Sequence, residues 1–181
     1  AVLPPNIFDN QSINYWASRA VSEGADALLL RWPTHPPSPE QLNQILAQLA
    51  PECSVPLLLR TVEMPLPETL AKVQGLHFPG FVHLPDLAQL PENKYIGRSC
   101  HTAGDVSRAY AAGCHYAFLS PVFPTATHLG QPPLGLESLT HIARQTPLPV
   151  FALGGITPEN EPHCRAAGAW GVAAIGMFGG R

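Results

Sequence analysis

A long polar loop separates an apolar run from a helix-like pattern in residues 119–139, LSPVFPTATHLGQPPLGLESL. Thr125, Thr127 and His128 follow the apolar run, and further prolines separate them from the next pattern. A tight hairpin would not need so many polar residues. Because hydroxyl and imidazole groups can donate hydrogen bonds to anionic oxygens, this loop is predicted to hold a ligand.

Two later turns carry glycines where backbone groups could bind an anion. Gly154 and Gly155 follow one apolar run, and Ile175 and Gly176 end another. Because glycine has no Cβ atom, backbone N–H groups in such a turn can approach an oxyanion closely. We therefore expect a phosphate site at these two turns, although tight turns alone would also account for the glycines.

A helix is predicted to begin directly after the first of these turns. Thr157 precedes Pro158, and Asn160 is close by, which is typical of an N-cap followed by proline in the first helical turn. The positive end of the helix dipole would then favour an anion at the glycine turn.

The elements that must position these residues recur along the chain. The segments SRAVSEGADALLLRW (18–32), SRAYAAGCHYAFLSP (107–121) and CRAAGAWGVAAIGMF (164–178) share one order, and residues 71–85 carry a fainter copy. In each, an alanine-rich helical end is followed by a glycine, a small residue and a short apolar run. The glycine suits a helix C-cap, and the apolar run suits a strand buried on both faces. Parallel strands joined by helices are therefore predicted.

Counting these units predicts eight parallel strands with helices outside them, which specifies a TIM (β/α)8 barrel in the α/β class. The predicted strands are residues 1–5, 27–32, 55–61, 80–85, 95–100, 116–121, 149–155 and 171–177. The predicted helices are residues 12–23, 39–49, 67–73, 103–112, 134–145 and 158–167. The sequence stops at Arg181, soon after the last predicted strand, so the eighth helix is expected to be absent. The apolar flank that this helix would cover makes a homodimer a secondary expectation.

Composition limits the possible functions. A chain of 181 residues, of which 45% are hydrophobic, is expected to form a single domain over residues 1–181. The charged fraction is 13% and the net charge is −3, so no basic field for nucleic acid is expected. The cysteines are scattered, which disfavours disulfides and zinc sites. With no leader and no run long enough to cross a bilayer, we expect a soluble cytoplasmic protein without membrane contacts.

Four motifs in the second half resemble the thiamine phosphate synthase/TenI family. They are IGRSCHT, SPVFPTATHLGQPPLGLESL, PVFALGGITPEN and AAGAWGVAAIGMF, in the family's order and at its strand positions. The resemblance covers most of residues 95–178, whereas the first half matches only in spacing. The resemblance implies a (β/α)8 barrel. Members of this family either join a pyrimidine diphosphate to a thiazole phosphate with release of pyrophosphate, or aromatise the thiazole phosphate.

The resemblance assigns roles to the polar loop and to the glycine turns. The family's P-x-F-P-T-x-T-K loop lies over the substrate, and Thr125 and Thr127 match the threonines that bind its pyrophosphate or phosphate portion. The lysine position holds His128, a weaker phosphate partner than an ammonium group. The residues that match the family's backbone cradle for thiazole phosphate are Gly154, Gly155, Ile175 and Gly176.

Residues near the ends of two other predicted strands also match. Ser99 matches a family serine near the pyrophosphate, and His101 matches an adjoining histidine. Arg31 keeps the arginine of the family's Q-x-R-x-K motif, so it is expected to bind substrate. The partner that the resemblance implies is a small phosphorylated heterocycle, either thiazole phosphate or thiamine phosphate.

The first half departs from the family where a magnesium site is implied. The family carries Asn-Asp after the third strand, where this chain has Leu59 and Arg60. After the fourth strand the family has H-L-G-x-x-D, but here His83 and Leu84 are followed by Pro85. The two lost aspartates are the family's magnesium ligands, so Mg²⁺ is the implied cofactor although its ligands are not found. A guanidinium is not expected to replace the metal, because it cannot reproduce octahedral coordination.

Three functions remain open. We expect a transferase of the thiamine phosphate synthase type. One alternative is a thiazole tautomerase-like isomerase, but Pro121 occupies the position of its acid/base histidine, so His83, His101 or His128 would have to serve. Another is a non-catalytic barrel that binds thiazole phosphate or thiamine phosphate, which the lost aspartates suggest. A metal site made of His83, Asp86 and His101 is disfavoured because its spacing is not a recognised one.

Overall fold

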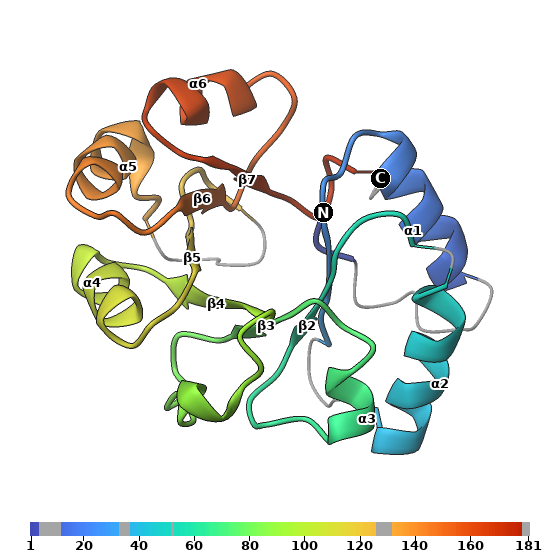
Figure 1. Ribbon diagram of the computed structural model, residues 1–181. Helices are drawn as coiled ribbons and strands as arrows, with labels where there is room; N and C mark the ends of the chain where they lie inside the picture. Colours follow the sequence, from blue (N-terminus) through green and yellow to red (C-terminus); the bar gives the residue numbers. More distant parts are fainter. Residues whose placement is uncertain (4–11, 33–36, 52, 126–131, 179–181) are drawn as a thin grey trace.

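The computed structural model describes residues 1–3, 12–32, 37–51, 53–125 and 132–178. Its parallel strands form one curled sheet of seven strands in sequence order, with helices on the outer side (Figure 1). The strands are β1 Leu28–Leu30, β2 Leu57–Arg60, β3 Gly75–Phe78, β4 Tyr95–Cys100, β5 Tyr116–Leu119, β6 Val150–Leu153 and β7 Gly171–Ala173. The helices are α1 Ser12–Ser22, α2 Pro39–Leu49, α3 Pro67–Leu70, α4 Ala103–Ala111, α5 Gly135–Arg144 and α6 Glu161–Ala166, with a 3-10 turn, η1, at Leu87–Gln89. The predicted parallel α/β architecture is confirmed for this sheet.

The first residues of the chain bond to the first strand of the sheet, β1, and to the residue that follows the last strand, β7. Val2 forms an isolated parallel bridge with Leu29, and the Leu3 N–H donates to the Leu29 carbonyl at 3.0 Å. The Val2 N–H donates to the carbonyl of Ala174, just beyond β7, at 2.9 Å. In the described residues the strand expected at residues 1–5 is therefore a single bridge, and the sheet itself has seven strands rather than the eight predicted.

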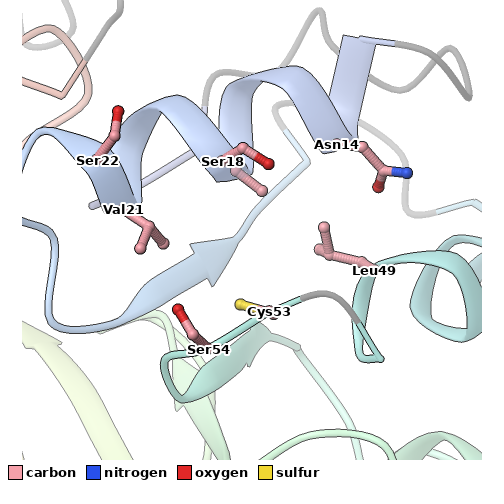
Figure 2. Close-up of a pocket in the computed structure, with 8 residues that line it drawn as sticks. Asn14, Ser18, Val21, Ser22, Leu49, Cys53 and Ser54 are labelled. Carbon is pink, nitrogen blue, oxygen red and sulfur yellow. The ribbon is translucent and has the colours of Figure 1, made fainter.

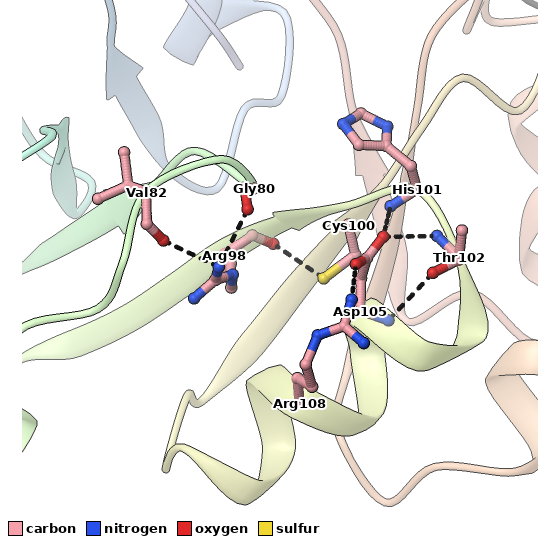
Figure 3. Close-up of polar contacts among 8 residues, drawn as sticks. All are labelled: Gly80, Val82, Arg98, Cys100, His101, Thr102, Asp105 and Arg108. Atoms are coloured by element: carbon pink, nitrogen blue, oxygen red, sulfur yellow. Dashed lines mark hydrogen bonds and ion pairs between the residues drawn. The ribbon is translucent and has the colours of Figure 1, made fainter.

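The strand predicted at residues 80–85 is wrong. The structure places β3 at Gly75–Phe78, where four consecutive residues are buried. Proline follows directly and lacks the N–H that would continue the ladder. The Arg98 side chain donates to the carbonyls of Gly80 and Val82 at 3.0 and 2.9 Å, which fixes this segment as a loop (Figure 3).

Side chains alternate between two cores along the strands. The larger core fills the space between sheet and helices, and a smaller cluster fills the inside of the curled sheet. The buried members of the inner cluster are Val2, Leu29, Leu58, Tyr116, Phe118 and Ala173. Leu29 and Leu58 thus mark the inner face of β1 and β2. Arg31 and Arg60, two residues further along, extend that face toward the carboxyl ends of the strands.

Local capping explains why two helices begin where the sequence predicted. The Gln41 N–H donates to the Ser38 hydroxyl at 3.3 Å, and the Ser38 N–H donates to the Gln41 side chain at 3.0 Å. Thr102 and Asp105 form the same reciprocal cap at the start of α4. Such caps pair backbone N–H groups that a helix leaves unbonded. None of the described helices has the length and apolar character needed to cross a membrane.

Candidate functional site

The loops that follow β5 and β6 meet at the carboxyl end of the sheet. The Val122 N–H donates to the Leu153 carbonyl at 2.9 Å, and the Phe123 N–H donates to the Gly154 carbonyl at 3.0 Å. Backbone bonds of this kind fix the two segments without depending on side chains. The structure therefore places the start of the polar loop beside the first glycine turn.

Both residues of that turn require glycine. Gly154 and Gly155 have φ angles of +94° and +65°, a region that residues with a Cβ atom rarely adopt. A Cβ atom on Gly154 would lie 2.8 Å from the Cα atom of Pro121. One on Gly155 would lie 2.5 Å from the Pro124 carbonyl oxygen. Close packing against the neighbouring loop thus accounts for the glycines in part, independently of any ligand.

The same turns present backbone donors. Among the described residues, no acceptor pairs with the N–H groups of Gly154, Gly155, Ile175 and Gly176. These residues follow β6 and β7, which are neighbours in the sheet. N–H groups that gather at adjacent strand ends can bind the oxygens of one phosphate group. The arrangement is therefore chemically suited to a phosphate ester.

The helix after the first glycine turn begins later than predicted. Helix α6 starts at Glu161, so Pro158 lies in the preceding turn and Thr157 is not the N-cap. Asn160 bridges this segment instead: its Nδ2 donates to the Gly155 carbonyl at 2.9 Å, and its Oδ1 accepts from the Thr157 N–H at 2.9 Å. The turn is thus positioned by the Asn160 side chain rather than by a helix that starts at Pro158.

Ser99 belongs to a buried chain of hydrogen bonds. His77 on β3 lies 2.9 Å from the Ser99 hydroxyl through Nε2 and 3.2 Å from the Tyr116 hydroxyl through Nδ1. Burial, followed by the charges of Arg60 and Arg31, lowers the pKa of His77 to about 3. His77 is therefore neutral near pH 7 and fixes the position of the Ser99 hydroxyl.

His77 is not predicted from the sequence, because the strand is expected at residues 80–85 and lies one segment earlier, at Gly75–Phe78. The H-L-G-x-x-D pattern was compared at His83 and Leu84, which lie in the loop after β3. Counted from His77 on the strand itself, the aspartate position of that pattern is Val82. A histidine in a short apolar run between a glycine and a proline was the signal that could have located the strand.

The side chains at this end of the sheet do not fit a magnesium site. Mg²⁺ is bound mainly by carboxylate oxygens and water. The positions where the resemblance implies aspartates hold Arg60 at the end of β2 and Val82 in the loop after β3. The described residues contain no group of three His, Cys, Asp or Glu side chains that could hold a metal ion, and Asp86 caps η1. His83, Asp86 and His101 are accordingly not gathered into such a group in the described part of the chain.

His101 lies at the start of the loop after β4. Its Nδ1 donates to the Ser120 carbonyl at 2.7 Å. Its backbone N–H donates to the Asp105 carboxylate at 3.0 Å, as Figure 3 shows. The same carboxylate accepts from the N–H of Thr102, so it fixes this loop and caps α4 at once. The exposed imidazole of His101 is thereby held beside the end of β5, where the polar loop begins.

The described part of the polar loop reaches Thr125, whose side chain is half-buried. The loop returns close to its start, because the Leu134 N–H donates to the Pro121 carbonyl at 2.8 Å. Thr127 and His128, which the sequence assigned to ligand binding, lie outside the described residues. The structure thus defines where the loop leaves and rejoins the sheet.

Arg31 and Arg60 lie side by side in register. Leu30 pairs with Leu59, and the two arginines are the next residues along these neighbouring strands. Both are half-buried, and burial lowers the pKa of each guanidinium. The Nε atom of Arg31 is buried and has no hydrogen-bond partner among the described residues. Arg60 in turn pairs in register with His77, so the two positive charges lie beside a neutral imidazole on the next strand.

Two residues that could suggest chemistry are placed for packing. Cys100 is fully buried, and burial raises the pKa of its thiol to about 12, so it is not a thiolate nucleophile near neutral pH. Trp32 is 8% exposed and belongs to the larger core between sheet and helices.

Two hollows in the structure are not lined by the glycine turns, Ser99 or the two arginines. A cavity of about 260 Å³ lies between α1 and the segment that connects α2 to β2, with Asn14, Ser18 and Cys53 in its lining (Figure 2). A groove of about 550 Å³ opens where Tyr95 begins β4 and Trp170 precedes β7, at the amino ends of the strands. The candidate site is therefore defined by the loops at the opposite, carboxyl ends.

Comparison with known proteins identifies a family model over nearly the whole chain and curated relatives over about half of it. Residues 1–178 match the family model described as Thiamine monophosphate synthase. A Putative thiamine-phosphate synthase 2 of Aquifex aeolicus is 36% identical over 104 residues, which make up 54% of this chain and 56% of the relative. A Putative thiamine-phosphate synthase of Geobacter sulfurreducens is 40% identical over 87 residues, or 48% of this chain and 41% of the relative. The match thus spans roughly half the length of these curated relatives.

Solved structures share the fold at low sequence identity. A thiamine phosphate pyrophosphorylase from Pyrococcus furiosus superposes with a TM-score of 0.80 at 22% identity, covering 99% of this chain and 86% of that one. A 3-hexulose-6-phosphate synthase gives a TM-score of 0.67 at 15% identity, covering 96% and 88% of the two chains. Since differently named enzymes share the architecture, function has to be argued from the residues of the site.

Proposed function

This chain belongs to the thiamine monophosphate synthase family, and from that premise we propose that it is a transferase of the thiamine phosphate synthase type. In this proposal it binds thiazole phosphate at the glycine turns and joins it to a pyrimidine diphosphate, releasing pyrophosphate. The observation that supports it most is the set of N–H groups after β6 and β7 that lack an acceptor in the described part of the chain.

The thiazole phosphate is assigned to the glycine turns because their backbone N–H groups can donate hydrogen bonds to the oxygens of its phosphate group. Gly154 and Gly155 let the turn pack tightly against the start of the polar loop, where a Cβ atom would overlap it, and Ile175 and Gly176 offer further N–H groups from the next strand end. Fixed N–H groups cost no reorganisation when they meet a charged oxygen. Asn160, which holds the Gly155 carbonyl, acts here as a positioning residue.

The pyrimidine diphosphate is assigned to the neighbouring strand ends. The Ser99 hydroxyl, fixed by neutral His77, and the half-buried Thr125 provide donors for its oxygens in this proposal. Because negative charge builds up on pyrophosphate as its bond to the pyrimidine breaks, fixed donors to these oxygens lower the barrier. The other residues assigned to this part by the resemblance are His101, Thr127 and His128.

A second candidate is a barrel that binds the phosphorylated thiazole without joining it to a pyrimidine. It is favoured by Arg60 and Val82, which occupy positions where the resemblance implies magnesium ligands. The isomerase alternative has weaker support, because Pro121 stands where the tautomerases carry their acid/base histidine.

We also propose that residues 1–3 close the curled sheet as the eighth position of a (β/α)8 barrel. The support is the set of backbone bonds that join Val2 to Ala174 on one side and Leu3 to Leu29 on the other. Closure would bring the ends of β1 and β7 to one mouth, so that both substrate portions face the same space.

Incubation with thiazole phosphate and the pyrimidine diphosphate tests the proposed function. We expect thiamine phosphate and pyrophosphate to form in equal amounts, as measured by chromatography and a coupled pyrophosphate assay. Binding of thiazole phosphate by calorimetry without any product would favour the second candidate. Proton exchange on the bound thiazole would favour the isomerase, and absence of thiazole phosphate binding would overturn the proposal.

The Asn160→Ala variant tests whether the glycine turn is the binding element. Because this side chain holds the Gly155 carbonyl and the Thr157 N–H, we expect its loss to weaken thiazole phosphate binding about 5- to 10-fold. Calorimetry at fixed ionic strength measures this change. Asn93→Ala is the matched control, since Asn93 is exposed before β4 and is expected to leave the affinity unchanged. Equal affinities of the two variants would contradict the assigned role.

A further inference from the structure

Two positively charged side chains lie together at the carboxyl ends of β1 and β2. The register of the two strands makes Arg31 and Arg60 neighbours, on the face that Leu29 and Leu58 line further down. Both are half-buried, and the charge of Arg31 adds to burial in lowering the pKa of Arg60. Like charges are therefore held close to each other and partly shielded from water.

No negative charge of the described chain compensates this pair. The ion pairs among the described residues lie within α4 and α6 and at the end of α1, and none includes either guanidinium. The adjacent ring, His77, stays neutral because it is buried beside the two arginines. The Nε atom of Arg31 is buried without a hydrogen-bond partner among the described residues. An uncompensated, partly buried charge pair destabilises a fold unless an anion binds to it.

The arginine pair lies where the resemblance implies a magnesium site. Arg60 stands where the resemblance implies an aspartate that binds magnesium, and Val82 stands at the second such position. Two carboxylates with a divalent cation present a net charge close to zero to a diphosphate. Two guanidinium groups present two positive charges and up to ten N–H donors in planar forks that match phosphoryl oxygens. The substitution thus changes how a diphosphate can be held.

Contrary to the expectation that a guanidinium does not replace the metal, we infer that Arg31 and Arg60 together form a diphosphate subsite, whose fixed positive charge takes the place of a divalent cation without octahedral coordination. The diphosphate oxygens accept hydrogen bonds from the two guanidinium groups, and the bound anion removes the repulsion between them. Neutral His77, next in register to Arg60, keeps Ser99 in place beside the same subsite. The identity of the ligand as a diphosphate rests on the proposed function, whereas the anion site rests on the geometry of the pair.

Titration calorimetry with inorganic pyrophosphate tests the inference directly. We expect the wild-type protein to bind pyrophosphate in EDTA, and we expect added magnesium not to strengthen binding. Arg60→Gln is expected to weaken pyrophosphate binding about 10- to 30-fold, and Arg60→Lys less, because lysine keeps the charge but not the fork. Arg144→Gln, at an exposed position at the end of α5, is the control expected to match wild type.

Thermal unfolding in the absence of anions provides a second readout that needs no turnover. Because Arg60→Gln removes a like charge from Arg31, the variant is expected to melt about 2–4 °C above wild type. Pyrophosphate in EDTA should raise the melting temperature of wild type, and raise that of the variant much less. Binding that requires magnesium, or equal pyrophosphate affinity in wild type and Arg60→Gln, would overturn the inference.

The outcome for thiazole phosphate separates this inference from the proposed function. The glycine turns are distinct from the arginine pair, so Arg60→Gln is expected to bind thiazole phosphate as wild type does. If wild type binds pyrophosphate without metal but not thiazole phosphate, the anion subsite stands and the proposed function fails. If thiazole phosphate binds and pyrophosphate binding depends on magnesium, the proposed function stands and the arginine subsite fails.

Discussion

A valine in place of Gly155 is expected to weaken thiazole phosphate binding at least 100-fold and to lower the free energy of unfolding by about 2–4 kcal/mol. The added Cβ atom would lie 2.5 Å from the Pro124 carbonyl oxygen, at a φ angle of +65°. The turn can relieve this overlap only by moving away from the polar loop, which would carry its N–H groups out of position. Calorimetry and urea unfolding measure the two effects.

Gly113→Val is the control variant. It introduces backbone strain at a positive φ angle without disturbing the proposed phosphate site. Gly113 also has a positive φ, +84°, but a Cβ atom there would meet no other atom within 4 Å. This control is expected to lose about 1–2 kcal/mol of stability and to keep the affinity of wild type. If Gly155→Val binds thiazole phosphate as tightly as Gly113→Val does, the turn after β6 is not the phosphate site.

Acid is expected to destabilise this protein through the buried ring of His77. Burial lowers the pKa of this histidine from 6.5 to about 3 in the folded state, whereas the unfolded chain titrates near 6.5. Below pH 6.5 the unfolded state therefore binds a proton that the folded state excludes, so stability falls as the pH falls. The expected slope from this residue alone is about 1.4 kcal/mol per pH unit, amounting to about 4–5 kcal/mol by pH 3.

Urea unfolding at a series of pH values between 3 and 8 measures this slope. Above pH 6.5 the contribution of His77 is complete and constant. His77→Gln removes the titrating group, so its free energy of unfolding is expected to depend less on pH, by about 1.4 kcal/mol per unit over the same window. His141→Gln, at an exposed position on α5, is the matched control and is expected to keep the wild-type slope. Parallel curves for wild type and His77→Gln would contradict the assignment.

Local chemistry made much of the fold predictable. The capping pair Ser38 and Gln41 stands at the start of α2, and the strand predicted at residues 95–100 has the bounds of β4, Tyr95–Cys100, although Arg98 and Ser99 lie within it. The strand at Gly75–Phe78 was missed because two short apolar segments follow α3, and hydrophobic pattern alone does not choose between them. Contacts distant in sequence decide the choice, since Gly75 packs against the backbone of Tyr95.

The glycine turns of the candidate site were predictable from the residues themselves, whereas Ser99, His101 and Arg31 were predicted from the family resemblance. Gly154 and Gly155 stand out in the sequence because few other residues fit such a turn. The roles of His77 and Asn160 could not be predicted from the sequence, because each depends on a partner that only the fold brings close. His77 bonds to Ser99, and Asn160 bonds to the Gly155 carbonyl. The same holds for the arginine pair, whose neighbours are set by strand register rather than by spacing along the chain.

A crystal structure of the protein with thiazole phosphate would show whether the glycine turns bind the phosphate group. We expect phosphate oxygens within about 3 Å of the N–H groups of Gly155 and Gly176, between the ends of β6 and β7. A thiazole phosphate bound elsewhere on the molecule, with these N–H groups facing only water, would contradict it.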